Sequence, residues 1–215
     1  MRTPMGGMFA LSMLVLGVTA ARSDDKGENR MVPEEGAIEV MLLRQASIRE
    51  ELKLSQGDAN KIEQFAKQQW TKAKEINKLP EAQQDAKFKA LAKENDQFID
   101  QNLKKEQRQR LKEIELQFAG LLCLTRPEIA KQLKLTDEQM KRVPVMQKEG
   151  RQELEDLLYT ARLEERKEKV AELRKTSREK MQKLLTDDQK RTWAQMQGKQ
   201  FTGEFDFGSK DAAAN

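Results

Sequence analysis

The sequence predicts an all-α protein made of long amphipathic helices that fold back on one another as antiparallel hairpins. Three observations support this fold class. Apolar residues recur at helical spacing over most of the chain, as in helices that bury one face. Charged residues make up 35% of the sequence and apolar residues 37%, a ratio that suits helices with a single buried stripe. Finally, helix-capping patterns recur at regular positions along the chain.

The clearest capping pattern is Leu135-Thr-Asp-Glu-Gln139, in which the threonine is a good N-cap and the glutamine can reach back to the cap amide. It recurs as Leu185-Thr-Asp-Asp-Gln189 and, in weaker forms, as Leu54-Ser-Gln-Gly-Asp58 and Leu103-Lys-Lys-Glu-Gln107. The second pair of motifs follows the first at offsets of 81 and 82 residues. This spacing predicts an internal duplication. The motif and capping residues are Leu54, Ser55, Leu103, Gln107, Leu135, Thr136, Gln139, Leu185, Thr186 and Gln189.

The pattern L-T-x-x-Q, used in pairs on a charged helical chain, resembles the motif of the Spy/CpxP family of periplasmic stress proteins. The matching segments are Leu135–Gln139 and Leu185–Gln189, whereas the earlier copies carry Asp58 in the glutamine position or lack the hydroxyl. The resemblance covers about residues 48–197. It implies a curved antiparallel helical dimer and an ATP-independent chaperone or sensor-accessory role.

This chain departs from the family pattern in two ways. The motif pair is present twice, and each pair is more closely spaced than in the family. We therefore expect two tandem Spy/CpxP-like repeats, residues 34–120 and 121–200, in which one chain supplies what the family builds from two. A homodimer is a further possibility that the resemblance implies.

Residues 1–21 have the composition of a secretory signal peptide. Arg2 supplies the basic start, Met8 to Val18 form a short apolar run, and small residues suited to cleavage follow. We therefore expect export to the periplasm without stable membrane insertion, and an uncleaved membrane anchor is the alternative. Residues 22–33 are polar and should form a disordered linker.

Three helices are expected in the first repeat, over residues 34–53, 55–79 and 81–119. Pro80 marks a turn between the second and third helices, which should therefore form an antiparallel hairpin. Gly120 is well placed to end the third helix.

The second repeat follows the same plan. Thr125-Arg-Pro-Glu128 is expected to be another capping box that opens a short helix ending near Leu133. A long helix then starts at Thr136 and should kink at Pro144. By analogy with the first repeat, a turn should fall within residues 161–166. Because no Gly or Pro marks that turn, one unbroken helix is the alternative.

The last helix should begin at the Thr186 cap and end at Gly198. The tail, residues 201–215, opens with aromatic residues that lack helical period. We expect it to lie against the helices before a disordered end, with a mobile client-facing arm as the alternative. The single cysteine, Cys123, lies among leucines and should be a small buried hydrophobe, with an interchain disulfide as the alternative.

Catalytic signatures are absent from the sequence. With no histidine, the usual Ser-His-Asp and Cys-His systems and histidine-based metal sites are excluded. No Gly-rich phosphate loop is present. Carboxylates alternate with Lys and Arg as on a solvated helix face. Removing Arg2 with the signal peptide lowers the formal charge from +4 to +3, too little for a nucleic-acid footprint. We therefore expect no enzyme activity, no cofactor, no metal and no nucleic-acid partner.

Two basic clusters are the candidate client-binding residues, because mixed cationic and apolar surface suits loose binding of partly unfolded chains. The alternative is that these charges only solvate long helices. The first cluster is Lys104, Lys105, Arg108, Arg110 and Lys112, and the second is Arg174, Lys175, Arg178, Lys180 and Lys183.

These features predict a periplasmic ATP-independent holdase whose partners are unfolded or partly folded envelope proteins. Two alternatives remain open. One is an accessory protein that binds the periplasmic domain of a membrane sensor kinase, and the other is a structural helical module of the envelope.

Overall fold

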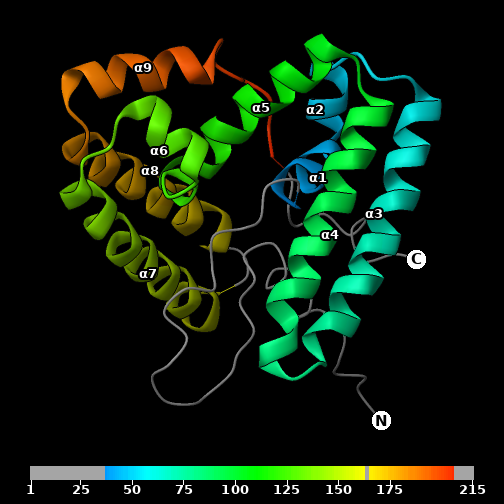
Figure 1. The fold of residues 1–215 in the computed structure, drawn as a ribbon, viewed down its shortest axis with the longest axis horizontal. Helices are drawn as coiled ribbons and strands as arrows, with labels where there is room; N and C mark the ends of the chain where they lie inside the picture. The colour runs from blue at the N-terminus through cyan, green and yellow to red at the C-terminus, as the bar shows by residue number, and fades with distance from the viewer. Residues whose placement is uncertain (1–36, 163–164, 206–215) are drawn as a thin grey trace. The chain divides into compact units, whose positions relative to one another are not determined.

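The structure, a computed structural model, describes residues 37–162 and 165–205, and all regular structure within these ranges is helical (Figure 1). The all-α fold class is therefore confirmed. The expected signal peptide (residues 1–21), the linker (22–33) and the end of the tail (206–215) lie outside the described residues. Within the described ranges, no helix has both the length and the apolar character that a membrane crossing requires.

The chain divides into two compact units, each described here by itself. The first unit contains Met1–Glu115 together with Phe201–Asn215, and the second contains Leu116–Gln200. The chain thus leaves the first unit within helix α5, close to the expected repeat boundary at residue 120, and returns to it with the tail.

The first unit is built around an antiparallel hairpin of two 22-residue helices, α3 (Gln56–Asn77) and α4 (Glu81–Asn102), which lie side by side (Figure 1). Their apolar stripes meet, and the rings of Phe65 and Phe98 stack nearly parallel with centroids 3.9 Å apart. At the turn, Gln84 Nε2 donates to the Leu79 carbonyl at 2.9 Å. The hairpin predicted at Pro80 is therefore present.

The expected first helix over residues 34–53 is instead two short helices, α1 (Ala37–Leu43) and α2 (Ala46–Glu51). The single-helix prediction is wrong because the apolar residues of α1 do not share one face. Ile38, Val40 and Leu43 point in different directions at 3.6 residues per turn, yet all are buried. The break lets α2, α3 and α4 contact α1.

The long helix expected over residues 81–119 is also interrupted, so α4 is followed by a separate α5 (Lys105–Ala119). Leu103 adopts an extended conformation (ψ 141°) and is buried, and the Lys104 amide donates to Gln107 Oε1 at 2.8 Å. The motif therefore starts a helix although it lacks a hydroxyl. The apolar stripe continues through Leu103, which is why periodicity did not reveal the break.

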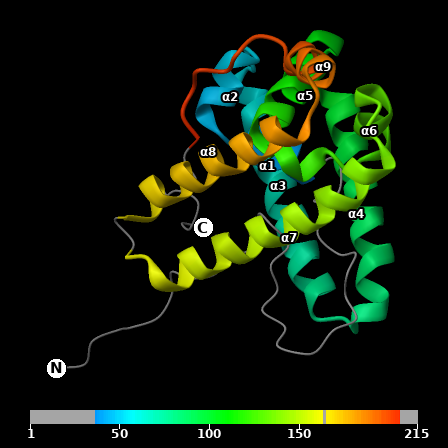
Figure 2. The ribbon, with the colours of Figure 1, turned by 90° about the vertical axis from the view of Figure 1, so that its left-hand side faces the viewer.

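The second unit contains a 3-10 turn (Gly120–Cys123) followed by four helices, α6 (Pro127–Leu133), α7 (Asp137–Thr160), α8 (Arg166–Leu184) and α9 (Asp187–Gln197). Helices α7 and α8 pack as a second hairpin (Figure 2), and Lys180 Nζ lies 2.8 Å from Glu153 Oε1 across it. The turn expected within residues 161–166 is therefore present, and the alternative of one unbroken helix is wrong.

Helix boundaries in the second unit agree with the sequence at the glycines but not at Thr125. Gly120 and Gly198 have φ values of 51° and 59° and follow α5 and α9, as expected. The N-cap of α6 is Arg126, whose side chain makes no cap hydrogen bond, so the capping box predicted at Thr125 is wrong. Pro127 favours this start because its fixed φ suits the first helical position. Helix α7 continues through Pro144 to Thr160.

The described part of the tail, residues 201–205, lies against helices of the first unit, as expected. Phe201 is 8% exposed, and Ser47 Oγ in α2 donates to the Glu204 carbonyl at 2.6 Å.

Cys123 is fully buried in the second unit, and its thiol lies 3.1 Å from the Gly120 carbonyl oxygen. Its prediction as a small buried hydrophobe is confirmed.

Candidate functional site

Three of the four sequence motifs form complete capping boxes. Ser55 Oγ, Thr136 Oγ1 and Thr186 Oγ1 each accept from the backbone amide three residues later, at 3.1, 3.2 and 3.3 Å. The side chains of Asp58, Gln139 and Gln189 accept in return from the amide of the cap residue. Each box therefore satisfies two backbone donors at a helix start.

In the second unit, Gln139 and Gln189 also bind each other. Gln139 Nε2 donates to Gln189 Oε1 at 2.7 Å, and Gln189 Nε2 donates to Gln139 Oε1 at 2.9 Å. The other amide protons bind the carbonyls of Leu184 at 2.9 Å and Lys134 at 3.2 Å. Each buried amide thus uses both donors and both acceptor positions.

We call this arrangement the glutamine node, and it joins four helices. Leu184 ends α8 and Lys134 caps the end of α6, while the capping boxes start α7 and α9. The node therefore satisfies backbone groups at two helix starts and two helix ends in the interior of the second unit.

The first unit has only half of this arrangement. Gln107 Nε2 donates to the Leu52 carbonyl at the end of α2 at 2.9 Å, and its Oε1 caps the Lys104 amide. Asp58 occupies the motif position that Gln139 has in the second unit, and an ionised carboxylate has no proton to donate. Its hydrogen bonds with Ser55 lower the pKa of Asp58 below its ordinary value.

The backbone before the first motif of each unit is the same. Lys53 and Lys134 both adopt the left-handed conformation, with φ values of 51° and 52°. The next amides, of Leu54 and Leu135, donate to carbonyls five residues earlier, at 2.9 and 3.0 Å. In each unit a short helix thus ends in a Schellman-type turn, and the motif that follows starts the next helix.

Ion pairs within the first unit engage both arginines of the first basic cluster. Arg110 pairs with Glu51 at 2.8 Å and Glu113 at 3.0 Å and is only 16% exposed, and Arg108 pairs with Asp100. Lys104 and Lys105 lie exposed at the start of α5. Arg110 therefore serves chiefly to hold α2 against α5.

The second cluster divides between structural and available cations. Arg174 lies over the Phe118 ring at 4.5 Å, and burial, with a contribution from Arg178, lowers the pKa of its guanidinium. Lys180 pairs with Glu153, as described above. Arg178 and Lys183 are exposed and make no ion pair with a carboxylate in the described part of the chain.

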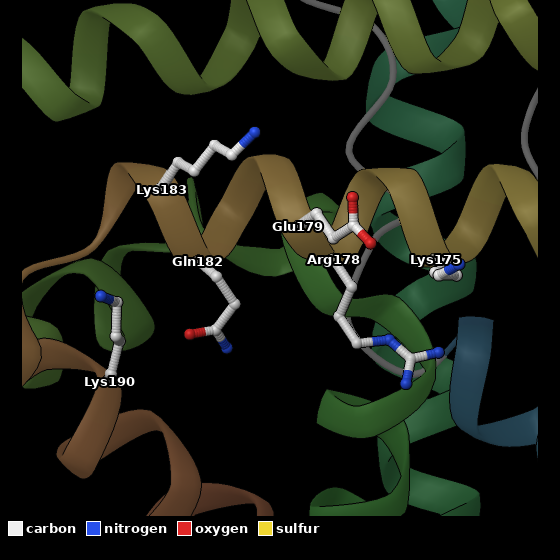
Figure 3. A pocket seen from close by; sticks show the side chains of 6 residues that line it. All are labelled: Lys175, Arg178, Glu179, Gln182, Lys183 and Lys190. Carbon is white, nitrogen blue, oxygen red and sulfur yellow. The ribbon is translucent and has the colours of Figure 1, made fainter.

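These available cations line an open hollow of about 700 Å³ on α8 and α9 (Figure 3). Arg178 and Gln182 project from α8 toward the side on which Lys190 extends from α9, whereas Lys183 projects to the other side of α8. Lys190 pairs with Asp187 at 2.9 Å and Lys175 lies 3.9 Å from Glu172, so Arg178 and Lys183 are the lining cations that make the hollow a candidate anion-binding surface. The lining residues are Lys175, Arg178, Glu179, Gln182, Lys183 and Lys190.

Sequence reasoning missed the contributions of Lys190 and Gln147. Lys190 stands outside the cluster in sequence and reaches the hollow only because α9 folds back. Gln147 is 3% exposed and its Nε2 donates to the carbonyls of Leu121 and Leu122 at 3.0 and 3.1 Å, holding the 3-10 turn. No sequence signal marked this glutamine among the many polar residues of α7.

In the residues that the structure describes, no three His, Cys, Asp or Glu side chains gather closely enough to hold a metal ion. Comparison with known proteins gave no matching family model, curated protein or solved structure. The likeness to the Spy/CpxP family therefore rests on the motif residues alone.

Proposed function

We propose that the chain is an exported, ATP-independent holdase-like protein that binds partly unfolded chains through their acidic segments. The observation that carries this proposal is the hollow on α8 and α9, where Arg178 and Lys183 are exposed and are not engaged by carboxylates of the described chain. Flexible cationic side chains with long aliphatic stems suit acidic segments of varied sequence, because each contact needs little geometric precision.

A dedicated partner, such as the periplasmic domain of a sensor kinase, is the second candidate. One observation favours it. Among the described residues, Val145 is the one large apolar residue that is exposed, with 57% of its surface accessible. A general holdase needs a larger exposed apolar area than this. An acidic patch on one folded partner would also bind the hollow.

The test is suppression of light scattering by unfolding clients, without ATP and with a metal chelator. We expect suppression of acidic clients at near-stoichiometric ratios. The double variant Arg178→Ala/Lys183→Ala should weaken client binding about five-fold or more, since two exposed charge contacts contribute roughly 1–2 kcal/mol together. Raising the salt concentration should have a similar effect.

The matched control is Lys141→Ala/Arg142→Ala, which removes the same charge from exposed positions of α7 outside the hollow. Unchanged suppression in the Arg178/Lys183 variant, or an equal loss in the control, would contradict binding at the hollow. Suppression of no unrelated client, together with capture of one folded acidic domain, would favour the dedicated partner.

A further inference from the structure

The tail segment 201–205 is held in the way that a bound peptide is held. It has no helical structure, yet the Phe201 ring is buried. Figure 1 shows the segment, in red, passing beside α2 after it leaves α9. Ser47 Oγ donates to the backbone carbonyl of Glu204 at 2.6 Å. Because the acceptor belongs to the backbone, this contact does not depend on the side chain at position 204.

Gly203 gives the segment its shape. A Cβ at this position would lie 2.3 Å from Phe201 Cζ and 2.8 Å from Ser47 Cβ, so no larger residue fits without displacing the segment. The Phe201 ring folds back over the glycine, and the Phe205 ring lies with its centroid 5.3 Å from it. The aromatic-x-Gly-x-aromatic sequence of the tail thus forms a compact bend whose backbone lies against Ser47.

We propose that the surface around Ser47 of α2 is a binding site for bent aromatic-x-Gly-x-aromatic segments of client chains, and that the tail occupies it as an intramolecular competitor. The identity of this partner rests on the proposed function, whereas the site rests on the contacts of the tail. A tail-covered site accounts for how a client-binding protein exposes so little apolar surface. Client segments reach the site only by displacing Phe201–Phe205.

A second copy of this chain is not the occupant that the contacts favour. Its tail would offer the same groups, while the resident tail is tethered at an effective concentration of about 1 mM. At micromolar protein, an identical segment from another copy therefore loses this competition. A client segment with additional aromatic residues gains affinity that the tail lacks, and this gain offsets the tether.

The experiment uses the full chain and a labelled heptapeptide with the sequence Lys199–Phe205. Gly203→Val in the chain displaces the tail without altering any residue of α2. Fluorescence anisotropy should show the peptide binding this variant at least ten-fold more tightly than the unaltered chain, because the competitor has been removed. The same peptide carrying Gly203→Ala should bind neither chain. Circular dichroism checks that helicity is unchanged.

If Gly203→Val disturbs folding, Phe201→Ala/Phe205→Ala in the full chain removes the aromatic anchors of the tail instead, with the same expected gain. Peptide binding that is equal in the released and unaltered chains, or absent from both released variants, would overturn the proposal. Arg178→Ala/Lys183→Ala should leave peptide binding unchanged. A failure of the aromatic site can thus be distinguished from a failure of client binding at the hollow.

Discussion

The two units treat the same motif pair differently. In the second unit, Gln139 and Gln189 exchange hydrogen bonds and use every donor and acceptor of their amides in a buried position. In the first unit, Gln107 keeps one cross-helix contact, while Asp58 serves its own helix only. A carboxylate can replace glutamine in a capping box, which needs an acceptor, but not in the node, which also needs donors. The motif therefore combines two separable roles.

Breaking the node should have the largest effect on stability. Gln139→Leu removes a cap contact and leaves the Gln189 amide partly unpaired in the interior, so we expect a loss of about 2–4 kcal/mol from the second unit. Gln107→Leu in the first unit, where the side chain is half-buried, should cost about 1 kcal/mol.

The two tryptophans allow each unit to be followed separately in urea unfolding. Trp193 is buried in the second unit and reports on it alone in a Trp70→Phe background, while Trp70 reports on the first unit in a Trp193→Phe background. The double variant Gln139→Leu/Gln189→Leu should lower the free energy of unfolding by about 1–3 kcal/mol less than the sum of the two single variants, because the two side chains bind each other. Additive losses, or equal losses in the two units, would contradict the comparison.

Acid should sharpen the difference between the units. The pKa of Asp58 is lower in the folded chain than in the unfolded chain, so its stabilising effect is present above its ordinary pKa and is lost as the pH falls through the lowered value. Gln139 has no charge to lose. Asp137 and Glu138 in the first turn of α7 lie outside its capping hydrogen bonds, so we expect acid to reduce hydrogen-exchange protection more in the first turn of α3 than in that of α7.

Asp58→Gln is the matched control, since glutamine keeps an acceptor at this position but does not titrate. The acid response at the start of α3 should disappear in this variant. An equal loss of protection at α3 and α7, corrected for intrinsic exchange rates, would show that Asp58 is not the cause of the difference.

The smallest effect is expected where the units agree. Lys53→Gly and Lys134→Gly should each raise stability by about 0.5 kcal/mol, because glycine relieves the left-handed strain but adds freedom to the unfolded chain. Lys131→Gly, inside α6, should instead cost about 1 kcal/mol. Single-tryptophan urea unfolding measures all three, and a gain at only one of the two junctions would show that their strain differs.

Local sequence chemistry predicted much of this fold. The sequence predicted the caps at Ser55, Thr136 and Thr186 and the glycine ends of α5 and α9, because a cap involves neighbours three or four residues apart. The helix breaks at Arg44 and Leu103 could not be predicted from the sequence. In each case tertiary burial ended a helix whose local sequence favours continuation.

The candidate site was harder to predict from the sequence for the same reason. The sequence placed Gln139 and Gln189 in equivalent motifs, but their mutual hydrogen bonds join residues 50 positions apart. Charge clusters were visible, yet the pairing of Arg110 with Glu51, 59 positions away, depends on the fold. Only the structure separates such structural cations from Arg178 and Lys183.

The return of the tail to the first unit constrains the order in which the protein is completed during synthesis. Ser47 and Glu204 are 157 positions apart, so the ribosome makes the whole of the second unit before this contact becomes possible. The second unit is one continuous segment and can finish folding first. The unit that begins the chain is therefore the last to acquire all of its native contacts, and a ribosome that stops before residue 201 leaves it incomplete.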